Sequence, residues 1–149
     1  SHFFILRPTN PFRSANIIKA AWKKYKRYKN CDSLRAVSIV KEHPGKMWKE
    51  KNNFIFPLMK NKILNQPSYN SQYKSLPTIL VQNASLEISK TSILNKYKTI
   101  TGKKIVPYFN NKFESYDINY EIDLEFAKLL VNKKKVKLTK INKKSFYSK

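Results

Sequence analysis

The chain has 149 residues, of which 31 are Lys or Arg and 9 are Asp or Glu, giving a formal net charge of +22. This length suits one domain with a real core, and 41% hydrophobic residues exclude wholesale disorder. A single cysteine excludes a disulfide framework, and no apolar run approaches the about 20 residues of a membrane-spanning helix. We therefore expect a soluble, cytoplasmic protein with no membrane partner.

The N-terminal part of the chain predicts two strands joined by a helix. Residues 3–6 form a short apolar run that stops at a proline, which is typical of a buried strand. Ser14 can cap a helix that continues with helical apolar spacing to about Lys29. Residues 34–40 are rich in β-branched side chains and predict a second strand. This succession predicts a βαβ unit with parallel strands and a right-handed crossover.

The pattern loosens over residues 41–77, where four prolines interrupt it and only residues 54–56 suggest a short strand. A stretch of this kind in a compact domain is usually functional or an interface excursion. Further along, order returns in five expected elements: strands at 78–81, 84–88 and 105–109, a weak helix at 91–97, and a helix at 121–131 with Ile122, Phe126, Leu129 and Leu130 as its apolar face.

These elements predict an α/β protein with one domain at residues 1–132. Within it, residues of about 43–78 form the excursion. The remaining residues, 133–149, are strongly basic and have little apolar content, so a flexible tail is expected there.

A first polar cluster follows the first predicted strand and reads Leu-Arg-Pro-Thr-Asn-Pro-Phe-Arg over residues 6–13. Ligands of open α/β sheets bind at the carboxyl ends of strands, where this loop is expected. Thr9 and Asn10 offer hydrogen-bonding side chains, and Arg13 can hold an anion. An ordinary strand-to-helix turn explains the same residues.

A second cluster lies within residues 41–48. Lys46 beside Gly45 is a possible anion contact. His43 is of the residue type that serves as a general base at neutral pH. The sequence identifies no carboxylate or thiol partner for it, so a solvent-exposed or stacking histidine is the alternative.

The third cluster precedes the last helix. Asp117 and Asn119 are two residues apart, so in an extended stretch their side chains share one face. Oxygen ligands carrying one full charge suit Mg²⁺, which keeps several waters and is completed by substrate phosphates. A helix cap formed by Asn119 is the alternative interpretation.

Taken together, these motifs resemble those of the acylneuraminate (sialic acid type) cytidylyltransferases. Residues 6–13 resemble the L-Q-P-T-S-P-L-R loop of that family, and residues 41–48 resemble its K-x-H-P-x-K stretch. Residues 76–86 are similar to its L-P-x-x-x-x-x-N-G-A-L/I motif. Asp117, Ile118 and Asn119, with Asp123 following, resemble D-I-D/N-T-x-x-D. Order and spacing agree over roughly residues 3–131.

The resemblance implies a nucleotidyltransferase that joins CMP from CTP to an acidic nine-carbon (nonulosonic) sugar for surface glycan biosynthesis, releasing pyrophosphate with the help of Mg²⁺. It also implies a three-layer Rossmann-like nucleotide-sugar transferase fold with a mixed, mostly parallel sheet. By the same resemblance, Asp117 is the catalytic residue and holds the metal together with Asn119. The residues implied to contact nucleotide or sugar are Arg7, Thr9, Asn10, Arg13 and Asn83.

In this family the excursion forms a dimer contact that reaches the neighbouring subunit's site. The resemblance therefore implies a homodimer, with Lys46 and Gln72 as further nucleotide- or sugar-binding residues.

The sequence departs from the family in one large respect. Family members begin with a strand and a Gly-rich loop that cradles the CTP phosphates through backbone N–H groups. Here the two glycines are Gly45 and Gly102, and neither precedes the first predicted helix. The sequence thus predicts a fold that lacks its first strand and phosphate loop, and a chain that is incomplete or inactive by itself.

Two other function classes remain open. The net charge, together with aromatic residues among the lysines of residues 22–28, fits a basic nucleic-acid- or ribosome-associated protein. Lysine-rich composition with only four arginines also fits a solvated surface, because base readout favours arginine. The third class is a non-catalytic interaction module on the same fold.

Overall fold

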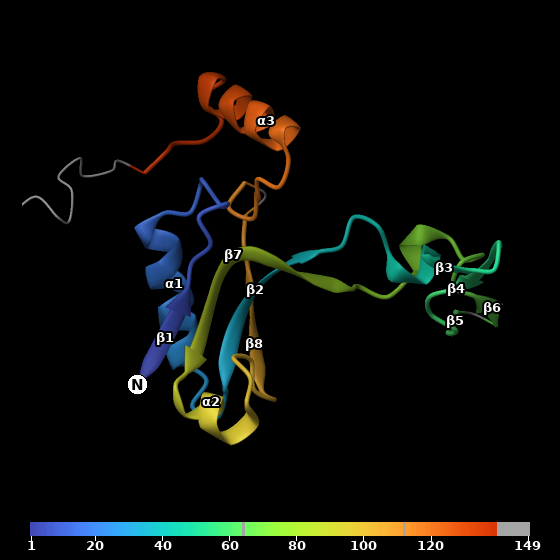
Figure 1. The fold of residues 1–149 in the computed structure, drawn as a ribbon, viewed down its shortest axis with the longest axis horizontal. Coiled ribbons are helices and arrows are strands. Elements are labelled where there is room, and N and C mark those ends of the chain that lie inside the picture. The colour runs from blue at the N-terminus through green and yellow to red at the C-terminus, as the bar shows by residue number, and fades with distance from the viewer. Residues whose placement is uncertain (64, 112, 140–149) are drawn as a thin grey trace, which may run out of the picture. The chain divides into compact units, whose positions relative to one another are not determined.

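The computed structural model describes residues 1–63, 65–111 and 113–139. The chain divides into two compact units, shown in Figure 1. The first, here called the sheet unit, contains Ser1–Ser38 and the chain from Gln82 onward. The second, here called the excursion unit, contains Ile39–Val81. The predicted excursion of about 43–78 falls within this second unit.

A four-stranded sheet organises the sheet unit. Its strands are β1 (His2–Ile5), β2 (Ser33–Ile39), β7 (Leu80–Lys90) and β8 (Ile105–Phe109). They lie in the order β1-β7-β2-β8. β1 pairs with β7 in antiparallel fashion, whereas β2 and β8 are parallel. β8 occupies an edge, as its Pro107 predicts, since proline cannot donate a ladder hydrogen bond.

The expectation of a three-layer, mostly parallel Rossmann-like sheet is wrong. Among the strand pairs whose register is defined, only β2 with β8 is parallel, while β1 with β7 and the two hairpins of the excursion unit are antiparallel. Figure 1 shows the strongly curved β7 running against both β1 and β2. The described residues form only three α-helices, too few to cover both faces of such a sheet.

The physical reason for this difference is the position of β7. Residues 78–81 and 84–88 suggested two short strands, but one strand spans Leu80–Lys90 and inserts between β1 and β2. The two strands of the expected βαβ unit are therefore not hydrogen-bonded neighbours. Strand pairing joins residues far apart in sequence, so local periodicity does not determine it.

The first helix, α1 (Ala15–Lys26), follows the sequence pattern closely. The hydroxyl of Ser14 accepts a hydrogen bond from the Ile17 N–H, which caps the helix as predicted. The helix ends at Lys26, a turn before the expected Lys29. Its buried side chains join a core with residues of the sheet: Ile17, Ala21, Tyr25, Cys31, Leu34, Ala36, Leu86, Ile88 and Val106.

Two further helices complete the sheet unit, the short α2 (Ser92–Tyr97) and α3 (Glu121–Asn132). α3 packs differently from the prediction. Leu130 is buried together with Ala127 and Phe12, but the other members of its expected apolar face are exposed: Ile122, Phe126 and Leu129. Helical periodicity identifies an apolar face but does not say which part of it meets a neighbour.

The described part of the predicted tail is not wholly separate from the core. Val136 packs against the cluster formed by Phe12, Ala127 and Leu130. Residues 140–149 of that tail lie outside the described residues. In the parts of the chain that the structure describes, no helix combines the length and apolar character needed to cross a membrane.

Two short antiparallel hairpins form the strands of the excursion unit. β3 (Trp48–Lys51) pairs with β4 (Phe54–Pro57), and β5 (Lys62–Ile63) pairs with β6 (Gln66–Pro67). Single turns of 3₁₀ helix cover Pro44–Lys46 and Tyr73–Ser75. Asn52 and Asn53 form the β3–β4 turn with positive φ angles of 52° and 64°, which asparagine tolerates.

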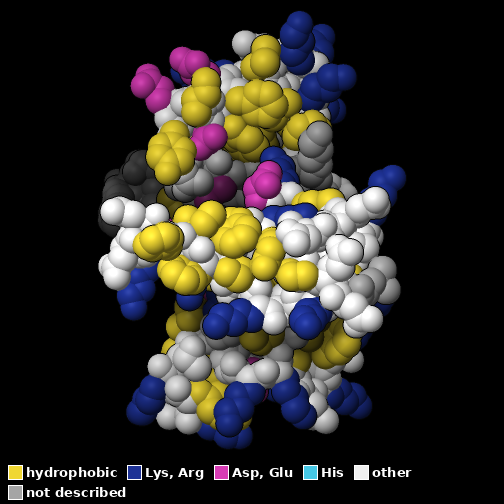
Figure 2. All heavy atoms as spheres, turned by 90° about the vertical axis from the view of Figure 1, so that its right-hand side faces the viewer, with side chains coloured by type: hydrophobic (Ala, Val, Ile, Leu, Met, Phe, Trp, Pro, Cys, Tyr) yellow, Lys and Arg dark blue, Asp and Glu magenta, His cyan; other side chains and the backbone are white. Residues whose placement is uncertain are grey.

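The apolar side chains of the β3–β4 hairpin face outward. Phe54 is 70% exposed, and its neighbours Ile55, Phe56 and Trp48 are exposed as well. Figure 2 shows apolar side chains gathered into a band on this surface, with basic side chains below it. An exposed apolar surface of this kind is typical of interaction sites in proteins.

Candidate functional site

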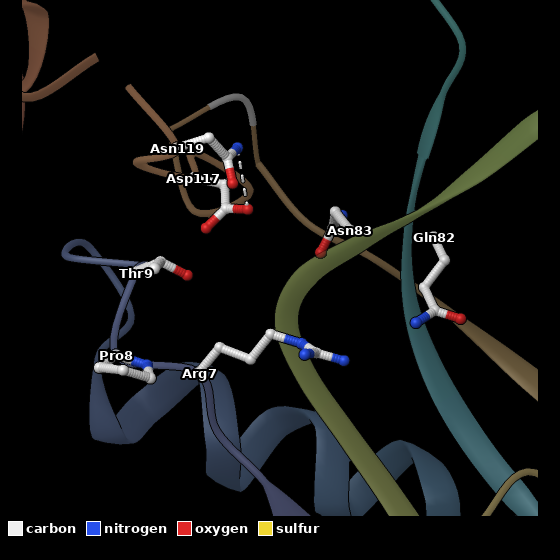
Figure 3. A pocket seen from close by; sticks show the side chains of 7 residues that line it. All are labelled: Arg7, Pro8, Thr9, Gln82, Asn83, Asp117 and Asn119. Carbon is white, nitrogen blue, oxygen red and sulfur yellow. Dashed lines mark hydrogen bonds between the residues drawn. The ribbon is translucent and has the colours of Figure 1, made fainter. Parts of the chain in front are cut away.

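Three separate segments of the sheet unit meet around one cavity of about 680 Å³. They are the loop after β1, the beginning of β7 and the segment before α3. Figure 3 shows Arg7 and Asp117 facing this opening from the first and the last of these segments. The lining residues are Arg7, Pro8, Thr9, Gln82, Asn83, Asp117 and Asn119. Five of them are predicted site residues, which the structure brings together from positions more than 100 residues apart.

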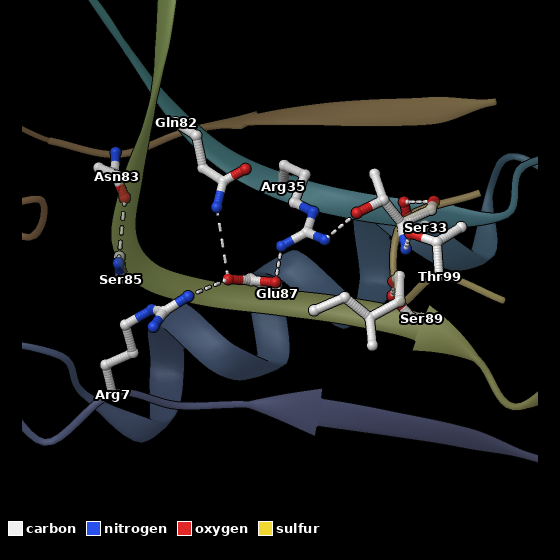
Figure 4. A network of polar contacts seen from close by, with 11 residues as sticks. Arg7, Ser33, Arg35, Gln82, Asn83, Ser85, Glu87, Ser89 and Thr99 are labelled. Atoms are coloured by element: carbon white, nitrogen blue, oxygen red, sulfur yellow. Dashed lines mark hydrogen bonds and ion pairs between the residues drawn. The ribbon is translucent and has the colours of Figure 1, made fainter. Parts of the chain in front are cut away.

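Arg7 is held at the cavity by a buried carboxylate. Its Nη2 lies 3.0 Å from Oε1 of Glu87, whose side chain is 2% exposed. The other oxygen of Glu87 forms an ion pair with Arg35, as Figure 4 shows. Two guanidinium groups thus share one carboxylate, so the cluster keeps a positive charge and the half-exposed Arg7 retains donors for an anionic ligand.

Burial affects the guanidinium deeper in this network. Arg35 is 7% exposed and also donates to the hydroxyl of Thr101. Desolvation, followed by the positive charge of Arg7, lowers its pKa from the ordinary arginine value. The cost of burying this charge explains why Glu87 is needed beneath the cavity, where it pairs with Arg35 and positions Arg7 at once.

Asn10 and Arg13 shape the loop rather than line the cavity. The buried Asn10 amide donates to the carbonyl oxygens of Glu114 and Tyr116, both at 2.9 Å. Arg13 donates to the carbonyl oxygens of Ser85 at 2.6 Å and Arg7 at 3.0 Å. These bonds join the loop after β1 to β7 and to the segment before α3. The structure therefore gives Asn10 and Arg13 supporting positions next to the cavity.

Asp117 presents an oxygen without a protein partner. Its Oδ2 accepts a hydrogen bond from the Asn119 amide at 3.3 Å, while its Oδ1 is buried and has no partner among the described residues. Asn119 does not cap the following helix. Oδ2 of Asp123 does so instead, accepting the backbone N–H groups of Asn119 and Tyr120 at 2.9 Å each. Asn119 is thereby left facing Asp117.

Asp117 and Asn119 fit a divalent cation for which the protein supplies only some of the ligands. The orphaned Oδ1 of Asp117 is a hard oxygen ligand, and the Asn119 side chain adds a neutral amide beside it. Within the described ranges, no three His, Cys, Asp or Glu side chains group closely enough to bind a metal by themselves. Such a site suits Mg²⁺, which takes one or two carboxylates from protein and the rest from phosphate and water.

The remaining predicted residues belong to the excursion unit, and none of them lines this cavity. Nζ of Lys46 donates to the carbonyl oxygens of Tyr69 at 2.9 Å and Ser71 at 2.5 Å. Gln72 is exposed at the start of the second 3₁₀ turn and makes no capping bond. Lys46 therefore has a structural role in its own unit, and Gln72 remains accessible.

His43 is not placed as a general base. Its Nδ1 accepts the Gly45 N–H at 2.9 Å, so Nε2 carries the proton and donates to the Pro77 carbonyl at 2.9 Å. Both ring nitrogens are engaged and the side chain is buried. The solvent-exposed alternative is also wrong, because the side chain is buried. The ring does pack against an aromatic residue, edge-on to Tyr73 with the ring centres 6.1 Å apart.

Two residues important to the cavity were missed by sequence reasoning. Gln82 lines it and donates weakly to Glu87 at 3.4 Å, and Glu87 anchors Arg7 from below. The signal for Glu87 was present in the sequence. A single acid between Leu86 and Ile88 in a predicted strand must either face water or find a cation in the core.

The chain matches no protein-family model and no curated protein. The arguments for function therefore rest on the geometry of this cavity.

Proposed function

We propose that the cavity is the sugar- and metal-binding part of a cytidylyltransferase that joins CMP from CTP to an acidic nine-carbon sugar. The observation that carries this proposal is the convergence of Arg7, Thr9, Asn83, Asp117 and Asn119 on one cavity. A cationic group on one side and a free carboxylate oxygen on the other match a ligand with its own carboxylate and a metal-bound phosphate. The use of CTP implies the cytoplasm as the compartment.

In the proposed reaction, the anomeric hydroxyl oxygen of the sugar bonds to the α-phosphorus of CTP. The bond from that phosphorus to pyrophosphate breaks, and the hydroxyl proton passes to water. Asp117, with Asn119 beside it, would hold Mg²⁺, which would neutralise charge on the phosphates and acidify the hydroxyl. Arg7 orients the sugar through its carboxylate. The Gln82 amide bonds the sugar hydroxyls, because both donors of the Asn83 amide are already bonded to Ser38 and Asn110.

Transfer of CMP requires a cradle for the triphosphate in addition to the sugar and metal site. Neither glycine of the chain lines the cavity, so the described residues form no glycine-rich backbone cradle for a triphosphate there. We accordingly propose that this chain binds sugar and metal at Arg7 and Asp117 but transfers CMP poorly or not at all by itself.

The test is calorimetric titration of the chain with a panel of nonulosonic acids in the presence of CTP and Mg²⁺, with pyrophosphate release followed in parallel. We expect binding of one acid that falls at least tenfold in Arg7→Gln and loses its Mg²⁺ dependence in Asp117→Asn. The matched controls are Arg27→Gln and Glu125→Gln, which change similar groups outside the cavity. No binding of any acid, or equal losses in the controls, would overturn the proposal.

We also propose that the active form is a homodimer. The exposed apolar side chains of the β3–β4 hairpin support this, because such a surface is stabilised when a second copy covers it. Sedimentation velocity of the wild-type chain should show a species of twice the chain mass, and a monomer at all concentrations would contradict it.

A non-catalytic interaction module would show neither acid-dependent binding nor metal dependence at Asp117. The titration above therefore separates this alternative from the enzyme.

A further inference from the structure

A second cavity, of about 630 Å³, lies in the sheet unit between the end of α1 and the start of β8. It shares no lining residue with the cavity of Arg7 and Asp117. Four cationic side chains line it and no acidic one does: Lys24, Arg27, Lys29 and Lys104. Lys24 lies in the last turn of α1, Arg27 is the C-cap of that helix and Lys29 follows it. Lys104 directly precedes β8, so the tertiary structure brings it to the other three.

No acidic side chain among the described residues forms a salt bridge with these cations. Both salt bridges found in the described residues use Glu87, and neither involves this cavity. The nearby Asp32 directs its Oδ2 to the backbone N–H groups of Lys103 and Lys104, at 2.7 and 3.0 Å. Lys24 places its Nζ 5.7 Å from the ring centre of Phe109. Like charges at one opening raise the local potential and favour an anionic ligand.

The end of α1 would ordinarily oppose an anion, because its last carbonyl groups carry partial negative charge. Here two of those groups accept hydrogen bonds from the residues that follow the helix. The Lys24 and Tyr25 carbonyls accept the N–H groups of Arg27 and Tyr28, at 3.1 and 3.0 Å. The Tyr28 carbonyl accepts from Cys31 through both its N–H and its thiol. The basic side chains, rather than the carbonyl groups, therefore dominate the opening.

A purely structural explanation, the interaction of basic side chains with the helix dipole, accounts for only part of this arrangement. Lysine and arginine at a helix C-terminus interact favourably with the helix dipole, which is sufficient for Lys24 and Arg27. It does not explain Lys104, which belongs to the segment entering β8, nor the apolar groups exposed beside the cations. Tyr28 is 52% exposed and Ile105 is 45% exposed, and both line the same cavity.

We propose that this basic cavity binds single-stranded nucleic acid, with one base against Tyr28 and backbone phosphates at Lys24, Arg27 and Lys104. A surface that combines an exposed aromatic ring with several free cations matches the two parts of a nucleotide chain, the base and its phosphates. An inorganic phosphate needs only the cations, so the exposed tyrosine favours the nucleic acid. This inference stands independently of the proposed sugar site.

The experiment measures the affinity of the full chain for a labelled oligouridylate of twelve nucleotides, by fluorescence anisotropy at several salt concentrations. One variant removes three cavity cations, Lys24→Gln with Arg27→Gln and Lys104→Gln. The matched control removes three cations of the excursion unit, Lys49→Gln with Lys51→Gln and Lys60→Gln. Because both carry the same net charge, their difference reports the site and not the overall charge of the chain.

We expect the cavity variant to bind at least tenfold more weakly than the wild type. The slope of log affinity against log salt should become shallower by about 2, since each contacted phosphate of a single strand contributes about 0.7. The control should lose less than threefold. Tyr28→Ala should weaken binding roughly 5- to 150-fold, the range of one base–aromatic stack. The ring is exposed, so this variant is expected to fold normally.

Equal losses in the two triple variants would overturn the proposal and assign binding to diffuse charge. The proposal would also be overturned, in favour of a plain phosphate site, by two results together. Tyr28→Ala would keep the wild-type affinity, and inorganic polyphosphate would compete as strongly as oligouridylate at equal phosphate concentration. Loss in both Tyr28→Ala and the cavity variant, with the control unaffected, supports it.

Discussion

The two units of this protein differ in whether they bury apolar side chains. The sheet unit encloses apolar side chains contributed by α1 and the sheet, with Ala21, Leu34 and Leu86 fully buried. Among the described residues of the excursion unit, those that are buried are polar or glycine: His43, Gly45, Ser68 and Ser71. Its apolar side chains, such as Phe54 and Ile55, lie on the outside.

Directional hydrogen bonds replace a hydrophobic core in the excursion unit. His43 joins Gly45 to Pro77, and the hydroxyl of Ser68 donates to the Gly45 carbonyl at 3.1 Å. A side chain at position 45 would meet the His43 ring at 2.9 Å and Ser68 at 3.1 Å, so glycine is needed for this close approach. Tyr73 closes the network through its hydroxyl, which donates to the Lys41 carbonyl at 2.6 Å.

This contrast indicates a different source of stability in each unit. Apolar burial stabilises the sheet unit, because the hydrophobic effect depends on the area removed from water. A small unit without an apolar core gains little from burial, and its exposed hairpin gains most when another surface covers it. The residues that line the two cavities all belong to the sheet unit.

The largest expected effect tests the buried carboxylate of the sheet unit. Glu87→Gln leaves Arg35 buried without a counter-charge, so we expect a loss of about 3–5 kcal/mol in the free energy of unfolding. Urea denaturation followed by circular dichroism measures this. Glu50→Gln in the exposed β3–β4 hairpin is the control and should change stability by about 0.5 kcal/mol or less. Similar small changes in both variants would show that the buried pair contributes little.

A medium effect is expected from the hydrogen-bonded brace of the excursion unit. His43→Ala leaves the buried Gly45 N–H without its acceptor, at a cost of about 1–3 kcal/mol confined to that unit. Amide hydrogen exchange should show faster exchange at Gly45 and Ser68, with unchanged rates in Leu34. His2→Ala, at the other histidine, is the control. Accelerated exchange throughout the sheet unit would mean that the two units unfold together.

The smallest expected effect is a change in pH dependence in the sheet unit. Hydrogen bonds from the backbone N–H groups of Lys104 and Lys103 lower the pKa of Asp32 below its ordinary value. The stabilisation is therefore present above about pH 4, the usual aspartate range, and is lost as the pH falls through the lowered pKa. Asp32→Asn should flatten the acid side of a plot of urea midpoint against pH between 2 and 6. Glu125→Gln should keep the wild-type slope, and an unchanged slope in Asp32→Asn would contradict this assignment.

Much of the local structure was predictable from neighbouring residues. Ser14 caps α1 as its sequence position predicts, and the apolar spacing of the helix correctly places Ile17, Ala21 and Tyr25 in the core. Phe54–Pro57 forms the short strand expected there. These features depend on contacts between residues a few positions apart, for which the spacing of side chains is sufficient information.

The cavity was predictable in part. Motif order suggested Arg7, Thr9, Asn83, Asp117 and Asn119, and they do share one cavity. Other suggested residues serve the structure. Asn10 and Arg13 hold backbone carbonyls, because a polar side chain in a loop can be recruited by the chain as readily as by a ligand. Sequence spacing carries no information about which of these occurs.

By itself, the sequence determined where α1 begins, which face of it is buried, that a strand forms at Phe54–Pro57 and which polar residues are grouped along the chain. Only the tertiary structure decided that β7 lies between β1 and β2, that Glu87 holds Arg7 and Arg35 together, and that the apolar face of α3 is largely exposed. The physical reason is the distance along the chain between the residues that interact. Helix spacing and capping depend on nearest neighbours, whereas strand order and ion pairing join residues whose separation along the chain carries no local signal.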